Sequence, residues 1–234
     1  MGINTLDLHR PAPILIFGGS YDPVHQAHVE IARFFIHTFE AQELRIIPAG
    51  QPWQKSKLVA NAEQRCAMLK LAFAEIKETR IVIDLQEITR AEQNIASYSV
   101  ETLRSLRAEL GQEIPLILLI GADQFENLAS WRNWQQLFEL AHIVVAARPN
   151  YSDQAQHLDE ELAQKWQQTS SNPAEMKRYS FGKTWMAKDL AWDISATKIR
   201  EHLLRQDQTL AYASLIPPKV LDYIQSQGLY QAKI

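Results

Sequence analysis

Residues 13–28 read PILIFGGSYDPVHQAH, and this stretch indicates the fold more strongly than any other. Residues 13–17 are short, apolar and rich in β-branched side chains, and Gly18 and Gly19 follow them, which is typical of a buried strand. Residues 25–39 then repeat apolar side chains at helical spacing. A strand, a glycine turn and a helix in this order indicate the opening of a βαβ unit.

The rest of the chain alternates in the same way. Short apolar runs predict four further strands, at residues 44–47, 80–85, 116–120 and 143–147. Amphipathic stretches predict further helices at residues 62–76, 99–110, 131–140, 197–205 and 218–227. This alternation predicts an α/β fold: a Rossmann-like, doubly wound parallel sheet with helices on both faces and a small C-terminal helical part.

We expect a single domain across residues 1–234. Its Rossmann-like core spans residues 13–148, and residues 193–234 hold a second polar motif and the closing helices. Residues 149–192 are rich in Gln, Ser, Asp and Lys and carry weak strand signals, so we expect a peripheral insertion there. Within that insertion, residues 153–168 are compatible with a solvated helix.

Composition excludes several classes of protein. The 234 residues include 24 Lys and Arg and 27 Asp and Glu, and a net charge of -3 argues against binding nucleic acid by charge. The single cysteine, Cys66, excludes an internal disulfide and a multi-cysteine zinc site. The first 13 residues contain no apolar signal core, and the apolar run at 114–120 is too short to span a membrane. We therefore expect a cytoplasmic protein without a nucleic-acid or membrane partner; a homo-oligomer is left open.

The turn after the first strand has the features of a phosphate site. Gly18 and Gly19 allow backbone N–H groups to approach an anion closely, although neither the G-x-G-x-x-G fingerprint nor a P-loop is present. His25 and His28 lie three residues apart at a helix start, where one face suits anionic oxygens. Two alternatives remain open: plain surface polarity, or zinc binding, although the Glu of H-E-x-x-H is missing.

Residues 193–200, DISATKIR, form a second polar constellation. Ser195 is a plausible N-cap for the helix that follows, and the free N–H groups there, two hydroxyls and Arg200 suit an anion. The alternative is an ordinary capped helix that carries a surface arginine.

Both motifs resemble those of a known superfamily. GGSYDPVHQAH resembles the G-G-[TS]-F-D-P-x-H-x-G-H signature of the nucleotidylyltransferases, and ISATKIR resembles their I-S-[ST]-x-[IL]-R motif. The pieces between and after them are similar to those of the bacterial nicotinate-nucleotide adenylyltransferase family, over about residues 13–230. The similar pieces are Pro48 with the Lys55 loop, Ser97-Tyr98-Ser99, Gly121-Ala122-Asp123, Trp131, Arg148-Pro149 and Gly228-Leu229-Tyr230. Departures are Tyr21 for Phe, Ala27 for Gly, Gln54 for His and Ala96 for Pro.

The resemblance implies transfer of AMP from ATP to nicotinate mononucleotide, which gives deamido-NAD and pyrophosphate in NAD biosynthesis, by direct attack without a covalent intermediate. It implies catalytic roles for His25, His28 and Arg200. The implied ATP contacts are Gly18, Gly19, Ser20, Tyr21, His25, His28, Gly121, Asp123, Ile194, Ser195, Thr197 and Arg200. The implied acceptor contacts are Lys55, Tyr98, Ser99, Thr102, Trp131 and Arg148.

The resemblance also implies Mg²⁺ bound mainly through the ATP phosphates, which agrees with the lack of a carboxylate cage in the sequence. Several alternatives stay open. Trp131 could instead belong to a core stripe with Trp134 and Phe138, and Tyr98 and Thr102 could be loop and cap polarity. The acceptor could be nicotinamide mononucleotide or phosphopantetheine, and the chain could be a non-catalytic nucleotide sensor or an RNA-binding α/β domain.

Overall fold

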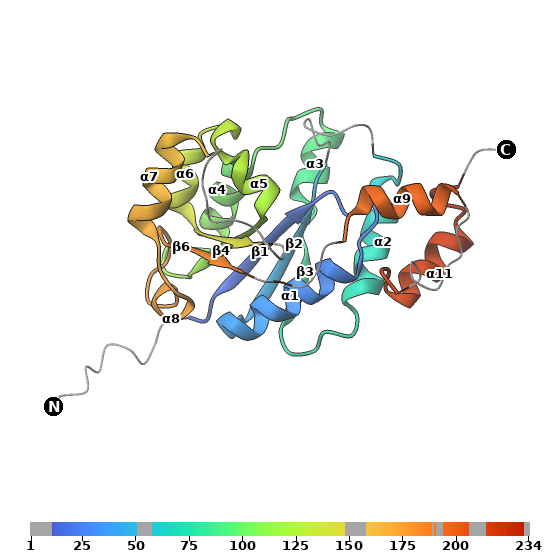
Figure 1. The fold of residues 1–234 in the computed structure, drawn as a ribbon, viewed down its shortest axis with the longest axis horizontal. Coiled ribbons are helices and arrows are strands. Elements are labelled where there is room, and N and C mark those ends of the chain that lie inside the picture. Colours follow the sequence, from blue (N-terminus) through green and yellow to red (C-terminus); the bar gives the residue numbers. More distant parts are fainter. Residues whose placement is uncertain are drawn as a thin grey trace.

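The computed structural model describes residues 11–50, 58–147, 158–188, 190, 194–205 and 214–231. Within these residues, six parallel strands form one sheet in the order β3-β2-β1-β4-β5-β6 (Figure 1). The strands are β1 (Ile14–Gly19), β2 (Glu43–Pro48), β3 (Arg80–Ile83), β4 (Leu116–Gly121), β5 (His142–Ala146) and β6 (Thr184–Ala187). The predicted parallel α/β sheet is therefore confirmed.

The strand order reverses at β1, which lies between β2 and β4. In the register, Phe17 pairs with Leu119 of β4, and Gly18 pairs with Ile47 of β2. The crevice beside the carboxyl ends of β1 and β4 is therefore the topological switch point, the place where open α/β sheets bind ligands.

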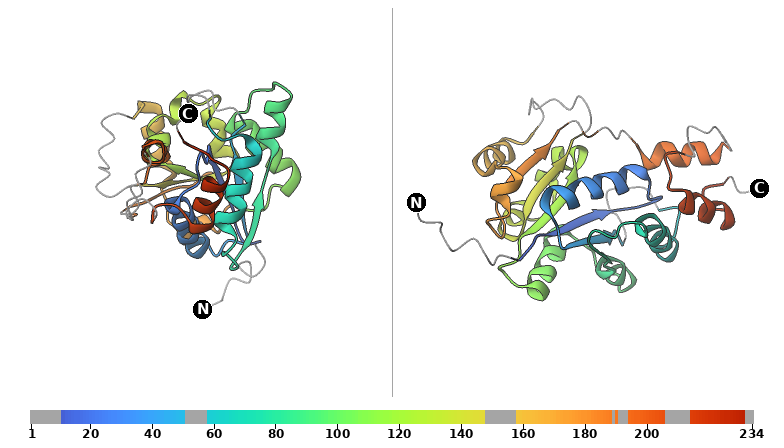
Figure 2. Two further views of the ribbon diagram at one scale, coloured as in Figure 1. Left: turned by 90° about the vertical axis from the view of Figure 1, so that its right-hand side faces the viewer. Right: turned by 90° about the horizontal axis from the view of Figure 1, so that it is seen from below.

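Helices cover both faces of the sheet, as predicted (Figures 1 and 2). They are α1 (Gln26–Phe39), α2 (Ala62–Phe73), α3 (Gln86–Glu92), α4 (Ser99–Leu110), α5 (Ala122–Glu126), the 3₁₀ turn η2 (Leu128–Ser130), α6 (Trp134–Leu140), α7 (Glu160–Thr169), α8 (Pro173–Met176), α9 (Ala196–Leu204) and α11 (Pro218–Ser226). In the described part of the chain, no helix has the length and apolarity needed to cross a membrane.

Side chains of β1 alternate between two apolar clusters, one on each face of the sheet. Leu15 and Phe17 point into the cluster that contains residues of α1, α2 and α11, whereas Ile14 and Ile16 point into the cluster of α4, α5 and α6. A strand buried on both faces has no polar side to alternate with, and this explains its unbroken apolar sequence.

Five short elements were not predicted from the sequence: β6, α3, α5, η2 and α8. β6 has only four residues, TWMA, and its sequence signal is masked by Lys183 and Lys188 on either side, yet it pairs with β5 along its full length. The seven residues of α3 are mostly polar, and Ile88 alone among them is buried. Elements this short are decided by their tertiary partners, because local periodicity needs more residues to be visible.

The helix boundaries differ from the predicted ones for local reasons. α6 begins at Trp134 instead of 131, because Asn133 adopts a left-handed φ of 51° at its N-cap. α7 begins at Glu160, where the Asp159 carboxylate accepts from two backbone N–H groups; the start of the predicted 153–168 helix lies outside the described residues. α11 ends at Ser226, one residue before the predicted end at 227, and Gly228 follows the C-cap residue Gln227 with a left-handed φ of 57°.

His142 on β5 ties β5 to the segment that precedes β6. Its side chain is fully buried; Nδ1 accepts from the backbone N–H of Lys183 at 3.1 Å, and Nε2 therefore donates to the carbonyl of Tyr179 at 2.8 Å. Burial lowers the pKa of His142 to about 4. The neutral ring is thus part of the folded state at physiological pH.

We expect the stability of the fold to fall between pH 6.5 and pH 4 because of His142. In the unfolded chain the imidazole takes up a proton near pH 6.5, but in the folded chain only near pH 4. The free energy of unfolding should therefore lose about 3 kcal/mol over this interval. In a His142→Gln variant this loss should be absent, whereas a variant at the exposed His37, His37→Gln, should keep the wild-type slope. Urea unfolding at pH 7 and pH 4 measures this loss for the wild type and both variants. An equal loss of unfolding free energy in all three proteins would contradict the assignment.

Candidate active site

The site lies at the carboxyl ends of β1 and β4. Gly18 is the last residue but one of β1 and Gly121 ends β4, and a Cβ added to either residue would meet no atom within 4 Å. Both backbones therefore face open space, which allows a ligand to approach the peptide groups directly. Asp123 follows on the first turn of α5 with its side chain exposed, at the same edge of the sheet.

An aromatic stack leads from the glycine turn into α1. Tyr21 is buried with a φ of 50°, and its hydroxyl donates to the carbonyl of Phe17 at 2.7 Å. The rings of His25 and His28 are stacked with centroids 3.7 Å apart, and the Tyr21 ring meets that of His28 edge-on at 5.0 Å. The two histidines therefore share one face at the start of α1, as predicted.

The proton of His28 can be assigned from its surroundings. His25 is the N-cap residue of α1, and its backbone N–H donates to Nδ1 of His28 at 3.1 Å. In the neutral ring an accepting Nδ1 leaves the hydrogen on Nε2. No acidic residue lies in the first turn of α1, so the positive end of the helix dipole is not neutralised there.

Arg200 joins the C-terminal motif to the glycine turn. Its Nη1 donates to the backbone carbonyl of Asp22 at 2.6 Å, and its Nη2 to the hydroxyl of Thr197 at 3.2 Å. Ser195 occupies the N-cap position of α9, although its side chain makes no capping hydrogen bond within the described chain. Two motifs that are 178 residues apart are thus in direct contact.

Asp22 is the hub of this contact. Its carboxylate accepts from the backbone N–H groups of Val59 and Ala60, at 2.8 and 3.0 Å, and from the hydroxyl of Tyr230 at 2.6 Å. Burial and the bond to Asp22 raise the pKa of Tyr230, so this hydroxyl keeps its proton. Asp22 therefore joins the glycine turn to the entry of α2 and to the end of the described chain.

Arg65 lies beneath the glycine turn. It projects from α2, is 1% exposed, and donates from Nη1 to the carbonyl of Ser20 at 2.9 Å. Its Nε has no hydrogen-bond partner among the described residues. Asp22, Arg65 and Tyr230 were not predicted as contributors to the site. The sequence signal for Arg65 was a cation on the apolar face of a helix, at helical spacing from Met68 and Leu69.

The predicted acceptor residues that the structure describes lie at the start of α4 and before α6, and these two helices pack against each other. Tyr98 is the N-cap of α4 and Trp131 is the C-cap of η2; both are half-buried against the same apolar cluster. The guanidinium of Arg132 lies 4.7 Å from the centre of the Tyr98 ring. The structure thus brings two aromatic side chains from separate predicted motifs to one side of the site.

The remaining predicted residues differ in their surroundings. Ser99 and Ile194 are half-buried, whereas Thr102 is buried and its hydroxyl contacts Arg90 and Glu87. Lys55 and Arg148 lie outside the described residues. In the described part of the chain no three His, Cys, Asp or Glu side chains are placed to hold a metal ion.

Comparison with known proteins agrees with this geometry. Residues 16–202 match the family model described as Cytidylyltransferase-like, which defines the class: nucleotide-transferring proteins of α/β fold. A solved structure from Plasmodium falciparum, nicotinic acid mononucleotide adenylyltransferase complexed with NaAD, superposes with a TM-score of 0.71 at 18% identity, over 94% of this chain and 98% of that one. This likeness supports the fold.

Sequence relatives narrow the class. A protein of Herminiimonas arsenicoxydans named "Probable nicotinate-nucleotide adenylyltransferase" is 42% identical over 219 residues, which cover 94% of this chain and 97% of the relative. A protein of the same name from Chromobacterium violaceum is 40% identical over 94% of this chain and 99% of its own. The chain therefore belongs to the nicotinate-nucleotide adenylyltransferase family.

We expect the Tyr230 hydroxyl to stabilise the fold through Asp22. Tyr230→Phe removes one hydrogen bond to a buried carboxylate and should lower the free energy of unfolding by about 1.5–3 kcal/mol. The matched control is Tyr223→Phe, since Tyr223 is a half-buried tyrosine of α11 whose hydroxyl makes no hydrogen bond to the described residues. Urea unfolding at pH 7 compares the two; equal losses would show that the Asp22 contact is not special.

Proposed function

We propose that this chain transfers AMP from ATP to nicotinate mononucleotide, with deamido-NAD and pyrophosphate as products. Family membership supports the chemistry, and the observation that carries it to this chain is the contact between Arg200 and the carbonyl of Asp22. That contact brings a cation and two helix N-termini, of α1 and α9, to the switch point of the sheet. Such a site suits a polyphosphate.

The reaction needs alignment and charge neutralisation more than proton transfer. A phosphate oxygen of the mononucleotide attacks the α-phosphorus of ATP; a P–O bond forms there while the bond to the β-phosphate oxygen breaks, and the electron pair leaves with pyrophosphate. A phosphate monoester has a second pKa near 6, so the nucleophile is already ionised at neutral pH. Asp22 is committed to three donors and is not needed as a base.

The residues of the chain then have distinct roles in the proposal. His28 donates from Nε2, and the amides of the turn and the α1 N-terminus bind the phosphate oxygens. Arg200, already held by Thr197, neutralises charge on the departing pyrophosphate. Tyr98 and Trp131 would pack on the pyridine ring, while Gly121 and Asp123 lie where the ATP ribose would bind.

We propose that Mg²⁺ is held in this site mainly by the ATP phosphates. Asp22 is occupied by its three donors, and the groups around the turn are imidazoles, hydroxyls and a guanidinium, which are poor Mg²⁺ ligands. When bound, the ion would offset phosphate charge in the transition state. We also propose a cytoplasmic location, as the sequence led us to expect.

Acceptor choice tests the proposed function. We expect kcat/KM for nicotinate mononucleotide to exceed that for nicotinamide mononucleotide, since a carboxamide would turn its NH₂ toward donors built for an anion, at about 1–3 kcal/mol for each unpaired group. Pyrophosphate release from ATP is measured with each mononucleotide and with phosphopantetheine. Preference for the amide would overturn the acceptor assignment, and no release with any acceptor would favour a nucleotide sensor.

The histidine pair gives a second test. His25→Ala and His28→Ala should each lower kcat by about 10²–10³, because a preorganised donor to the developing charge is lost. The matched control is His37→Ala, at an exposed histidine of the same helix, which should leave kcat unchanged. Turnover near the wild-type value in both variants would remove these residues from the mechanism.

A further inference from the structure

Helix α3 packs unusually closely on the end of β2. A Cβ added to Gly50, two residues after β2, would lie 2.2 Å from the backbone carbonyl oxygen of Glu87 and 2.7 Å from Cβ of Ala91. Real Cβ atoms are not found so close to backbone atoms, so α3 can occupy this position only because residue 50 is glycine. The contact between the backbones of Gly50 and Glu87 therefore fixes how closely α3 packs on the end of β2.

On its other side α3 holds the first turn of α4 through one hydroxyl. Nη1 of Arg90 donates to Oγ1 of Thr102 at 3.0 Å, and the same hydroxyl donates to Oε1 of Glu87 at 2.9 Å. Thr102 is 4% exposed, and its own N–H donates to the carbonyl of Tyr98 at 3.0 Å. Arg90 and Glu87 thus fix both the donor and the acceptor function of a buried group one turn from Tyr98.

The loop between the two helices is tied to α3 as well. The backbone N–H of Ile95 donates to the carbonyl of Arg90 at 2.8 Å, and the Ser97 hydroxyl donates to the carbonyl of Glu87 at 3.4 Å. The backbone on both sides of Tyr98 is therefore restrained by α3.

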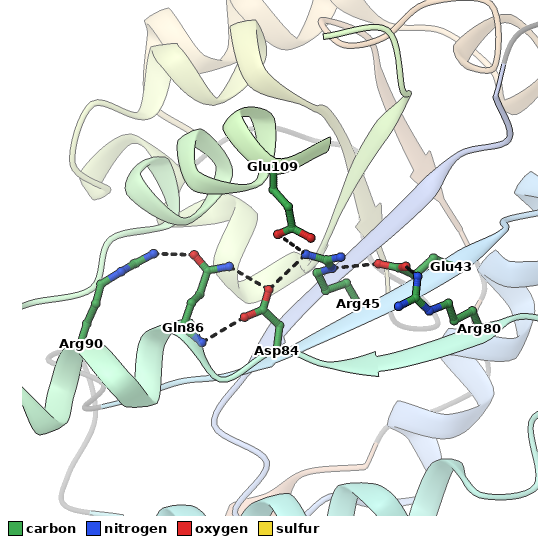
Figure 3. Close-up of polar contacts among 7 residues, drawn as sticks. All are labelled: Glu43, Arg45, Arg80, Asp84, Gln86, Arg90 and Glu109. Atoms are coloured by element: carbon green, nitrogen blue, oxygen red, sulfur yellow. Dashed lines mark hydrogen bonds and ion pairs between the residues drawn. The ribbon is translucent and has the colours of Figure 1, made fainter. Parts of the chain in front are cut away.

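A chain of polar contacts anchors Arg90 to the sheet (Figure 3). Arg90 donates to Oε1 of Gln86, and Gln86 donates to the carboxylate of Asp84 from both its side chain and its backbone at 3.0 Å. Asp84 pairs at 3.4 Å with Arg45, which is buried on β2. Arg45 also contacts Glu43 at 2.8 Å and Glu109 of α4 at 2.7 Å.

We propose that Arg90 and Glu87 are positioning residues for the acceptor mononucleotide, which they serve by fixing Thr102 and, through it, the Tyr98–Ser99 start of α4. The proposal rests on the proposed function and deepens its acceptor half. The side-chain hydrogen bonds of Arg90 and Glu87 to Thr102, which we call the clamp, join α3 to α4, whereas the residues assigned to the ATP phosphates lie on the glycine turn, α1 and α9. Loss of the clamp should therefore change KM for the mononucleotide and leave KM for ATP nearly unchanged.

Arg90→Met tests the proposal. It keeps an unbranched side chain but lacks the guanidinium, so it removes the bonds to Thr102 and Gln86. We expect KM for nicotinate mononucleotide to rise about tenfold to a hundredfold, because small misplacements of a positioning group have effects of this size. KM for ATP should stay within about twofold. The matched control is Arg104→Met, at an exposed arginine of α4 whose contacts are with Glu101 and Gln136; both KM values should keep their wild-type level.

A second variant displaces α3 without changing the side chains of Arg90, Glu87 or Thr102. Gly50→Ala forces the backbone at Glu87 to move, and it should raise KM for the mononucleotide selectively in the same way. If circular dichroism shows that Arg90→Met does not fold, Gly50→Ala alone tests the proposal. Parallel rises of both KM values, or no rise in a folded variant, would overturn the proposal. Wild-type enzyme that transfers AMP to no mononucleotide would instead overturn the proposed function.

Discussion

The buried carboxylate of Asp22 is the interaction on which the phosphate half of the site depends. It accepts three hydrogen bonds, from Val59, Ala60 and Tyr230, while the carbonyl of the same residue accepts from Arg200. One residue thus links the β1 turn, the entry of α2, helix α9 and the end of the described chain. A buried carboxylate with fewer partners would carry a large desolvation cost. The glycine turn is therefore stable only when the segments that supply the hydrogen bonds to Asp22 are in place.

The acceptor half is organised differently. Its aromatic residues stand on α4 and before α6, on the opposite face of the sheet from α1, and the polar clamp of α3 sets where α4 begins. The two halves meet at the carboxyl edge of the sheet. There the pKa of Tyr21 is raised, mainly by burial and to a smaller extent by the nearby Glu87 carboxylate. An enzyme that must align two anionic substrates gains from two supports that can be positioned independently.

Much of the fold was predictable because the periodicity of a long helix or buried strand is visible in its own sequence. Five of six strands and the long helices followed from apolar runs and helical spacing, and the parallel sheet followed from their alternation. β6 and α3 escaped because four and seven residues are too few to show a period, and their conformations depend on β5, Gly50 and Thr102. The predicted Ser195 cap is at the right position, yet its side chain makes no capping bond within the described chain.

The sequence by itself determined the succession of the longer strands and helices along the chain, and it determined the two motifs. Both follow from the local spacing of apolar, glycine and histidine residues, which is a property of the chain alone. It also determined the family, because those motifs are specific. Only the tertiary structure decided which distant groups meet: Arg200 with Asp22, Arg65 with Ser20, Arg90 with Thr102. Such pairs have no signature in spacing, because a hydrogen bond between remote residues depends on how the strands cross and the helices pack, and not on either residue's neighbours.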